Sequence, residues 1–123
     1  MHMSDALISP AVGISMLAVS GAALAYSTIK AKQENVLADK TVPMMGVMSA
    51  FVFAAQMINF TIPGTGSSGH IGGGILLAAL LGAYPGLISI AVVLLIQCLF
   101  FADGGLLALG CNTFNMGVLT CLV

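Results

Sequence analysis

The residues of this chain best suited to bind a metal ion are its two histidines. His2 directly follows Met1, and His70 lies in the glycine-rich run of residues 63–74. A free terminal amine, the amide nitrogen of His2 and its imidazole can close two fused chelate rings on one ion. The His70 imidazole can then add a fourth nitrogen. Four nitrogen donors in a plane favour Ni(II), Cu(II) or Co(II) over Zn(II), which prefers a tetrahedron, so this pattern predicts a metal site made of Met1, His2 and His70.

Other interpretations of the same residues stay open at this point. A histidine at a helix end facing water is often without function, and a glycine-serine run can serve only as a flexible loop. On that interpretation the chain is a truncated or structural membrane subunit without tight metal binding. The alternative role of the glycines is to let backbone pack closely over the amino-terminal segment.

Further polar residues could hold the histidine rings in one tautomer by hydrogen bonds. These are Gln97, Asp103, Asn112 and Asn115. Amides buried in membrane bundles often do no more than brace helices, and that interpretation also stays open. Gln56 and Asn59, three residues apart on a predicted helix, have a similar but weaker claim.

The elements that must position these residues are predicted to be transmembrane helices. Hydrophobic residues make up 59% of the 123-residue chain and charged residues 6%, with a mean hydropathy of +1.13, whereas soluble proteins carry about 25% charged residues. We expect an all-α, polytopic integral membrane bundle of about four to five helices of about 20 residues each. A net charge of -1 without any arginine argues against a nucleic-acid partner. The three cysteines lie in apolar sequence without C-x-x-C spacing and are expected to be small buried thiols.

The apolar runs and their breaks give the expected helices. Residues 7–29 and 42–60 form two predicted spans, and residues 30–40, with all three lysines, form a hydrated loop between them. The uncharged stretch 71–102 is broken by Tyr84-Pro85-Gly86 into a predicted hairpin or re-entrant pair of unusually short helices. A further apolar run begins near Leu106.

The lysines also predict an orientation. The positive-inside rule places the loop that carries them in the cytoplasm. Counting crossings outward, the amino terminus, the 61–70 loop and the 103–105 turn fall on the extracytoplasmic face. Both histidines, Asp5 and Asp103 are therefore expected at the same end of the bundle.

The ends of the chain carry two expectations. No signal-peptide pattern precedes the first apolar run, so the mature chain is expected to begin at Met1 with its amine available. The last run is still apolar at Val123, so residues 1–123 are expected to be a single transmembrane domain that is the amino-terminal part of a longer protein.

The motifs together resemble a known family. Met1-His2, the Pro63-Gly-Thr…Ser-Gly-His70 segment and the run Phe-Ala-Asp-Gly-Gly…Gly-Cys-Asn…Asn-Met-Gly, residues 101–117, are similar to the substrate-capture component of energy-coupling-factor cobalt/nickel transporters, the CbiM/NikM family. Ala6 differs from the glycine usual there, the segment before His70 is about one residue longer, and family members are longer chains.

The resemblance implies a multi-pass protein of the prokaryotic cell (inner) membrane whose amino terminus folds back into the bundle. It implies binding of Co(II) or Ni(II) as transported substrate, with no organic cofactor and no enzymatic activity of its own. The implied partners are a transmembrane coupling subunit, two cytoplasmic ATPase subunits and a small accessory membrane subunit. The chain itself has no G-x-x-x-x-G-K-[ST] phosphate loop. The choice between cobalt and nickel is left open.

Overall fold

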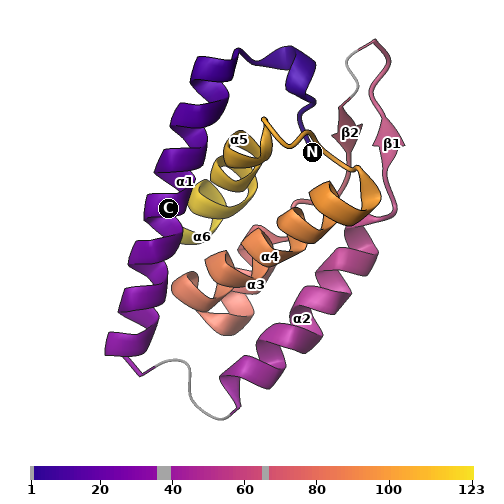
Figure 1. Cartoon of the computed structure of the whole chain (residues 1–123). Coiled ribbons are helices and arrows are strands. Elements are labelled where there is room, and N and C mark those ends of the chain that lie inside the picture. The colour runs from indigo at the N-terminus through magenta and orange to yellow at the C-terminus, as the bar shows by residue number, and fades with distance from the viewer. Residues whose placement is uncertain (1, 36–39, 65–66) are drawn as a thin grey trace.

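The computed structural model describes residues 2–35, 40–64 and 67–123, and these form helices joined by short connections, with one small hairpin (Figure 1). A 3-10 turn at Asp5–Leu7 precedes the first helix. The helices and strands are α1 (Pro10–Gln33), α2 (Thr41–Gln56), β1 (Phe60–Thr61), β2 (Ser68–Gly69), α3 (Gly74–Leu81), α4 (Ala83–Phe101), α5 (Leu109–Thr113) and α6 (Leu119–Leu122). A π-helical segment, Phe114–Val118, joins α5 to α6 without a break.

Helix α1 is shifted toward the carboxyl end relative to the predicted span 7–29. It begins after Ser9, whose side-chain oxygen accepts a hydrogen bond from the backbone N–H of Val12 at 3.3 Å. It continues past Lys30 to Gln33, so the expectation of a loop from residue 30 is wrong. Lys30 and Lys32 lie in the last turn, where positive charge interacts favourably with the helix dipole.

Helix α2 ends four residues before the predicted limit at Phe60. Its last carbonyl, that of Gln56, accepts a hydrogen bond from the Asn59 side chain at 3.4 Å, and the chain then turns into an antiparallel pair of two-residue strands. Phe60 lies opposite Gly69, and its ring occupies the space that a side chain at position 69 would need. Strands this short leave no alternating pattern in a sequence, so they were not predicted.

The predicted helix pair of residues 71–102 is present, but its break and its lengths differ from the prediction. The break falls at Gly82, whose φ of +95° favours glycine, while Pro85 lies in the first turn of α4, where its missing N–H costs little. Two short helices were predicted, but only α3, with 8 residues, is short, and α4 extends over 19 residues. The two helices pack closely, and a Cβ at Gly86 would lie 2.8 Å from the backbone of Ala78.

Close helix contacts at glycines hold the body of the bundle together. A side chain at Gly110 would collide with the backbone of Met16 and Leu17 in α1, and one at Gly74 would collide with Thr120 in α6. Small residues at such crossings let transmembrane helices approach each other. The largest fully buried apolar side chains of the core are Leu77, Leu87, Ile90, Leu94 and Met116. Cys111 and Cys121 are buried as expected, whereas Cys98 is only partly covered.

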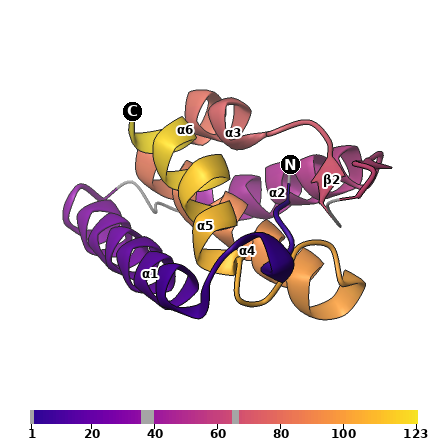
Figure 2. The ribbon, with the colours of Figure 1, turned by 90° about the horizontal axis from the view of Figure 1, so that it is seen from above.

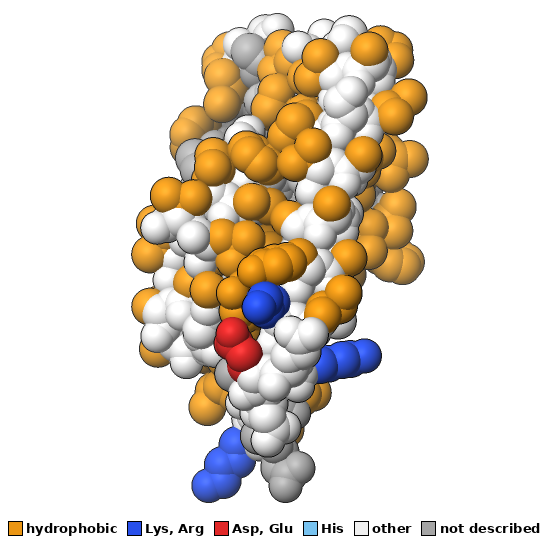
Figure 3. Space-filling model, turned by 90° about the vertical axis from the view of Figure 1, so that its left-hand side faces the viewer, with side chains coloured by type: hydrophobic (Ala, Val, Ile, Leu, Met, Phe, Trp, Pro, Cys, Tyr) orange, Lys and Arg blue, Asp and Glu red, His pale blue; other side chains and the backbone are white. Residues whose placement is uncertain are grey.

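The surface of the bundle is apolar around its sides and charged at one end. Helices α1 and α4 are long and apolar enough to cross a membrane, and α2 is apolar but shorter. In Figure 3 hydrophobic side chains are spread over the face shown, and the Lys and acidic side chains lie in its lower half. The amino-terminal segment lies at the opposite end, over the helices (Figures 1 and 2).

Candidate metal centre

The amino-terminal segment folds back, and its backbone forms hydrogen bonds to three other segments. The carbonyl of His2 accepts from the N–H of Ser68 in β2 at 3.2 Å. The carbonyl of Met3 accepts from Gly105 at 3.1 Å, and its N–H donates to Asn112 Oδ1 in α5 at 2.7 Å. Residues 2 and 3 therefore lie between the hairpin, the 103–105 turn and α5 (Figures 1 and 2).

The turn after α4 makes room for this segment. Gly104 has a φ of +90°, and a Cβ there would lie 2.7 Å from Cδ2 of His2. A side chain at Gly105 would collide with the carboxylate of Asp5, which accepts the backbone N–H of Ala108 at 2.9 Å. The Asp-Gly-Gly sequence thus lets the turn close over both residues.

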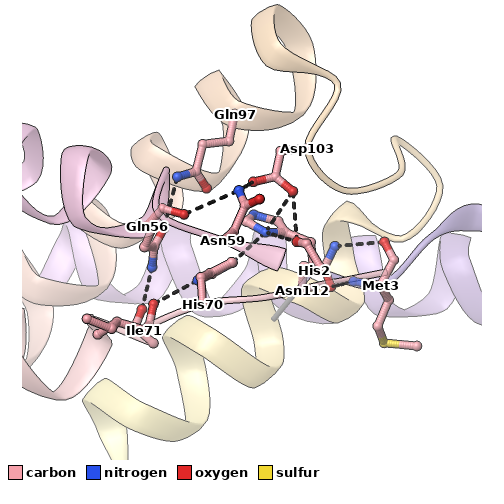
Figure 4. Close-up of polar contacts among 11 residues, drawn as sticks. His2, Met3, Gln56, Asn59, His70, Ile71, Gln97, Asp103 and Asn112 are labelled. Atoms are coloured by element: carbon pink, nitrogen blue, oxygen red, sulfur yellow. Dashed lines mark hydrogen bonds and ion pairs between the residues drawn. The ribbon is translucent and has the colours of Figure 1, made fainter. Parts of the chain in front are cut away.

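The two histidine side chains meet directly. His2 Nδ1 lies 2.6 Å from His70 Nε2, and the ring centroids are 4.5 Å apart with the planes tilted by 50°. The other ring nitrogen of His70, Nδ1, lies 2.8 Å from the carbonyl oxygen of Ile71. A carbonyl only accepts hydrogen bonds, so Nδ1 of His70 carries a hydrogen. In the neutral ring, Nε2 of His70 then presents its lone pair to His2 (Figure 4).

A carboxylate borders the histidine pair. Asp103 Oδ1 lies 3.4 Å from His2 Nδ1 and accepts a hydrogen bond from Ser68 Oγ at 2.9 Å. Its second oxygen accepts from Asn59 Nδ2 at 3.3 Å. One ligand atom from each of His2, His70 and Asp103 can be chosen so that all lie within 4.8 Å of one another. The arrangement offers two nitrogens and one oxygen to a single cation.

Both imidazoles lie where the neutral form is favoured. His2 is 2% exposed, and burial lowers its pKa to about 4, with Asp103 partly opposing and His70 reinforcing the shift. Burial also lowers the pKa of His70, although its hydrogen bond to Ile71 acts in the opposite direction. Neutral imidazole is the form that binds metal ions.

The remaining residues predicted for the site fall into two groups. Gln97 is fully buried and lies close enough to His2 to raise the pKa of that ring slightly against the effect of burial. Asn112 instead holds the backbone of Met3 from both sides, donating to its carbonyl at 3.4 Å as well as accepting from its N–H. Asn115 reaches only the sulfur of Met3, at 3.9 Å. Met1 lies outside the described residues.

Sequence reasoning missed Ser68, which contacts both Asp103 and the backbone of His2. The signal that could have found it is the spacing to His70. Residues two apart in an extended segment point to the same side, so a polar residue two positions before a candidate ligand is a candidate partner for it.

A cavity of about 760 Å³ opens beside the histidine pair. His2 and His70 line it together with Ile58 and Phe60 from the region after α2. The cavity gives the histidine rings a route to the outside of the bundle, although His2 itself is nearly enclosed.

Comparison with known proteins places this arrangement in a family. The sequence model described as "Cobalt uptake substrate-specific transmembrane region" (CbiM) matches residues 2–123. The putative fused nickel transport protein NikMN of Archaeoglobus fulgidus is 42% identical over 123 residues, which are 100% of this chain and 40% of that protein. The putative cobalt transport protein CbiM of Methanocaldococcus jannaschii is 32% identical over 118 residues, 96% of this chain and 50% of that protein.

Solved structures agree with these relatives. A crystal structure described as a transition metal transporter superposes with a TM-score of 0.82 at 42% identity, covering 95% of this chain and 50% of that one. A truncated transition metal transporter gives a TM-score of 0.83 at 39% identity, covering 95% and 53%. This chain thus spans about half the length of these structures and of the CbiM relative. It is a helical integral membrane protein, and it belongs to the CbiM family of cobalt and nickel transport proteins.

Proposed function

We propose that this chain captures Co(II) or Ni(II) as the substrate of an uptake transporter, with the His2 and His70 imidazoles among the ligands. The observation that carries the proposal is the 2.6 Å separation of His2 Nδ1 and His70 Nε2. When both rings present lone pairs, two nitrogens at this distance repel each other unless a cation lies between or beside them.

A hydrogen carried on Nδ1 of neutral His2 and a metal ion are the two partners that can satisfy such a pair. Burial lowers the pKa of both histidines, which disfavours an additional proton on the pair and keeps the imidazoles in the neutral form that binds metal ions. The carboxylate of Asp103, 3.4 Å from His2, adds negative charge that favours a divalent ion. Imidazole nitrogen is a suitable ligand for nickel and other late transition metals, and family membership directs the choice to cobalt and nickel.

The amine of Met1 and the amide nitrogen of His2 complete the proposed ligand set. Both nitrogens precede the His2 side chain in the chain, so they can close chelate rings with its imidazole on one ion. A deprotonated amide favours nickel in a planar site, and it releases a proton when the ion binds. On this proposal the ion is cargo, and the chain catalyses no reaction.

The orientation and the partners are part of the same proposal. Lys30 and Lys32 lie in the last turn of α1, at the end of the bundle opposite the amino terminus (Figure 1), which supports a cytoplasmic lysine end and an extracytoplasmic metal centre. The resemblance to energy-coupling-factor transporters supports a coupling subunit and two ATPase subunits as the source of energy, with a small accessory membrane subunit beside them.

The test is calorimetric binding of Ni(II) and Co(II) to the purified chain in detergent. The native chain is compared with one extended by a single residue before Met1, with His70→Ala, and with a control extended by one residue after Val123. We expect one ion per chain for the native protein and the control, and loss of binding in the other two. Equal weak binding by all four would overturn the capture role and support a structural membrane subunit.

A further inference from the structure

Three large apolar side chains stand exposed between the end of α2 and the hairpin. Ile58, Phe60 and Ile62 are 83%, 66% and 39% exposed, and we call them the apolar strip. Residues two apart in an extended segment point to the same side, and all three line the cavity of about 760 Å³ beside the histidine pair. One wall of this cavity is therefore apolar and largely uncovered by the described residues.

The polar residue within this segment faces the protein instead. Asn59 donates from its side chain to the carbonyl of Gln56 at 3.4 Å and to Asp103 Oδ2 at 3.3 Å. The segment thus has two sides, one bonded to the turn after α4 and one formed by the apolar strip. The strip is the side that points away from these contacts.

The apolar strip continues the outer face of α2. A backbone hydrogen bond of 3.3 Å from Ile58 to Ala55 extends the helical turn beyond the last residue of the helix. Val47, Phe51 and Ile58 are spaced by four and seven residues, so they lie on one helical face, and all three are exposed. An exposed apolar face on a helix of a membrane protein is suited to contact with lipid chains, and the strip prolongs that face.

Helix α2 is too short to cross the hydrocarbon layer alone. Lys40 marks its first end, and the helix has 16 residues. At about 1.5 Å per residue it is about 24 Å long against a core of about 30 Å, which leaves about 6 Å to the segment that follows. In Figure 1 that segment leads from the upper end of α2 into the hairpin. The strip therefore lies where the hydrocarbon layer ends.

The backbone of the hairpin limits how deep the strip can lie. Among the described residues, β1 has a strand partner on one side only, which is β2. Open sheet edges do not occur in lipid-exposed hydrocarbon, because their N–H and C=O groups need water or protein. The apolar side chains favour lipid and the open edge favours water, and the headgroup layer is the depth that offers both.

We propose that the apolar strip is a lipid-contact surface: Ile58, Phe60 and Ile62 lie in the headgroup layer of the leaflet at the metal end and contact phospholipid there. Phospholipid then closes the open side of the cavity beside the histidines. The lipid contact goes beyond the proposed function and does not depend on it. Its consequence for capture, an ion that arrives through the headgroup layer and not straight from bulk water, does rest on that function.

The test reads the depth of single tryptophans, because the sequence contains none of its own. Phe51→Trp, Ile58→Trp and Phe60→Trp are each made in the full chain and placed without metal in nanodiscs of phosphatidylcholine. The lipid chains carry bromine, which quenches tryptophan fluorescence on contact, either near the headgroup or near the methyl end. We expect bromine near the methyl end to cause the larger loss of fluorescence for Phe51→Trp, and bromine near the headgroup the larger loss for the two strip variants.

Two control variants separate depth from side and lipid from water. Thr61→Trp lies at the height of the strip but on the opposite side of β1, so brominated lipid should quench it less than Phe60→Trp. Gln33→Trp, at the exposed end of α1 beside the lysines, should be quenched by aqueous acrylamide and hardly by brominated lipid. Ile58→Trp guards against misfolding, because its side chain has the most free space, and helical content by circular dichroism is checked for every variant.

Two outcomes would overturn the proposal. Acrylamide quenching of Ile58→Trp and Phe60→Trp as strong as that of Gln33→Trp would place the strip in water. Protection of both from acrylamide and from brominated lipid would show that protein covers the strip, either a second copy or a further segment of a longer chain. A chain that shows the expected quenching but binds no Ni(II) would lose the proposed function and keep the lipid contact.

Discussion

The metal end and the helical body of this molecule are built by different means. At the metal end, residues 2–5, the hairpin and the 103–108 turn contain hardly any regular structure and are joined by individual hydrogen bonds such as Ser68 to Asp103. In the body, α5 approaches α1 and α3 approaches α6 so closely that Gly110 and Gly74 have no room for a side chain.

The difference predicts unequal stability. A hydrogen bond contributes about 1 kcal/mol net, so the metal end is held by a few small terms that can be lost one at a time. The body is held by close packing, where one added methyl group forces the backbone of a neighbouring helix to shift. We therefore expect the metal end to open at a lower free energy than the body, as segments that bind ligands often do.

Gly110→Ala should have the largest effect, because the new Cβ would meet the backbone of Met16 and Leu17, which cannot turn aside. We expect destabilisation of about 3 kcal/mol or more, measured as a fall in the thermal unfolding temperature in detergent. Gly21→Ala is the matched control, because no atom lies within 4 Å of a Cβ there. Equal unfolding temperatures for the two variants would contradict the account of the body.

Asn112→Ala should separate the two regions. It removes both hydrogen bonds to Met3, of 2.7 and 3.4 Å, and so releases the fold-back of His2. We expect Ni(II) affinity to fall about 10- to 100-fold, corresponding to about 1–3 kcal/mol, with helical content by circular dichroism retained. Asn115→Ala, which loses only a 3.9 Å contact to sulfur, should bind as the wild type does, and a comparable loss there would count against this role of Asn112.

Acid should open the metal end before the body. His2 has a pKa of about 4 in the folded protein against an ordinary value of 6.5, so between these values the open state binds more protons. The stability from neutral His2 is then complete above pH 6.5 and declines as the pH falls toward about 4. Hydrogen-exchange protection of the Met3 and Ser68 amides, corrected for intrinsic rates, should fall over this window while the body stays protected. His2→Gln should flatten the pH dependence, and an unaltered profile in that variant would assign it to another group.

Ser68→Ala should have the smallest effect of the four. It removes the 2.9 Å hydrogen bond to Asp103 but keeps the backbone bond to His2. At about 1 kcal/mol for one bond, Ni(II) affinity should fall about five-fold in a calorimetric titration. Ser15→Ala loses only a local bond to Ala11 within α1 and should leave the affinity unchanged. A loss of Ni(II) affinity in both serine variants would show that the titration reports the stability of the whole protein and not the contacts of the metal centre.

The body was more predictable from the sequence than the metal end. Long apolar runs specify membrane helices wherever they lie, so α1, α2 and α4 were each expected near their observed places. The errors fell at helix ends. Gly82 breaks the 71–102 run because of its left-handed backbone, while Pro85, the more conspicuous residue, fits within a first helical turn.

At the metal end, residue types could be predicted but not most of their contacts. His2, His70 and Asp103 were expected at one end of the bundle, and the structure brings their ligand atoms together. The hydrogen-bond partner of each side-chain amide depends on backbone positions that cannot be deduced from the periodicity of the sequence. Asn112 therefore holds Met3 and not a histidine ring, and the contribution of Ser68 depends on a strand of two residues.

The π-helical segment Phe114–Val118 lies where the two regions join in one helix. Before it, Asn112 contacts the amino-terminal segment; after it, Cys121 donates to the Gly74 carbonyl in the body at 3.4 Å. A π turn contains one residue more than an α turn, and one residue corresponds to about 100° of rotation about the helix axis. Deleting a single residue from this segment would restore an ordinary helix and rotate one of the two contact faces away from its partner. The extra residue thus sets the angular offset that lets one helix serve both regions.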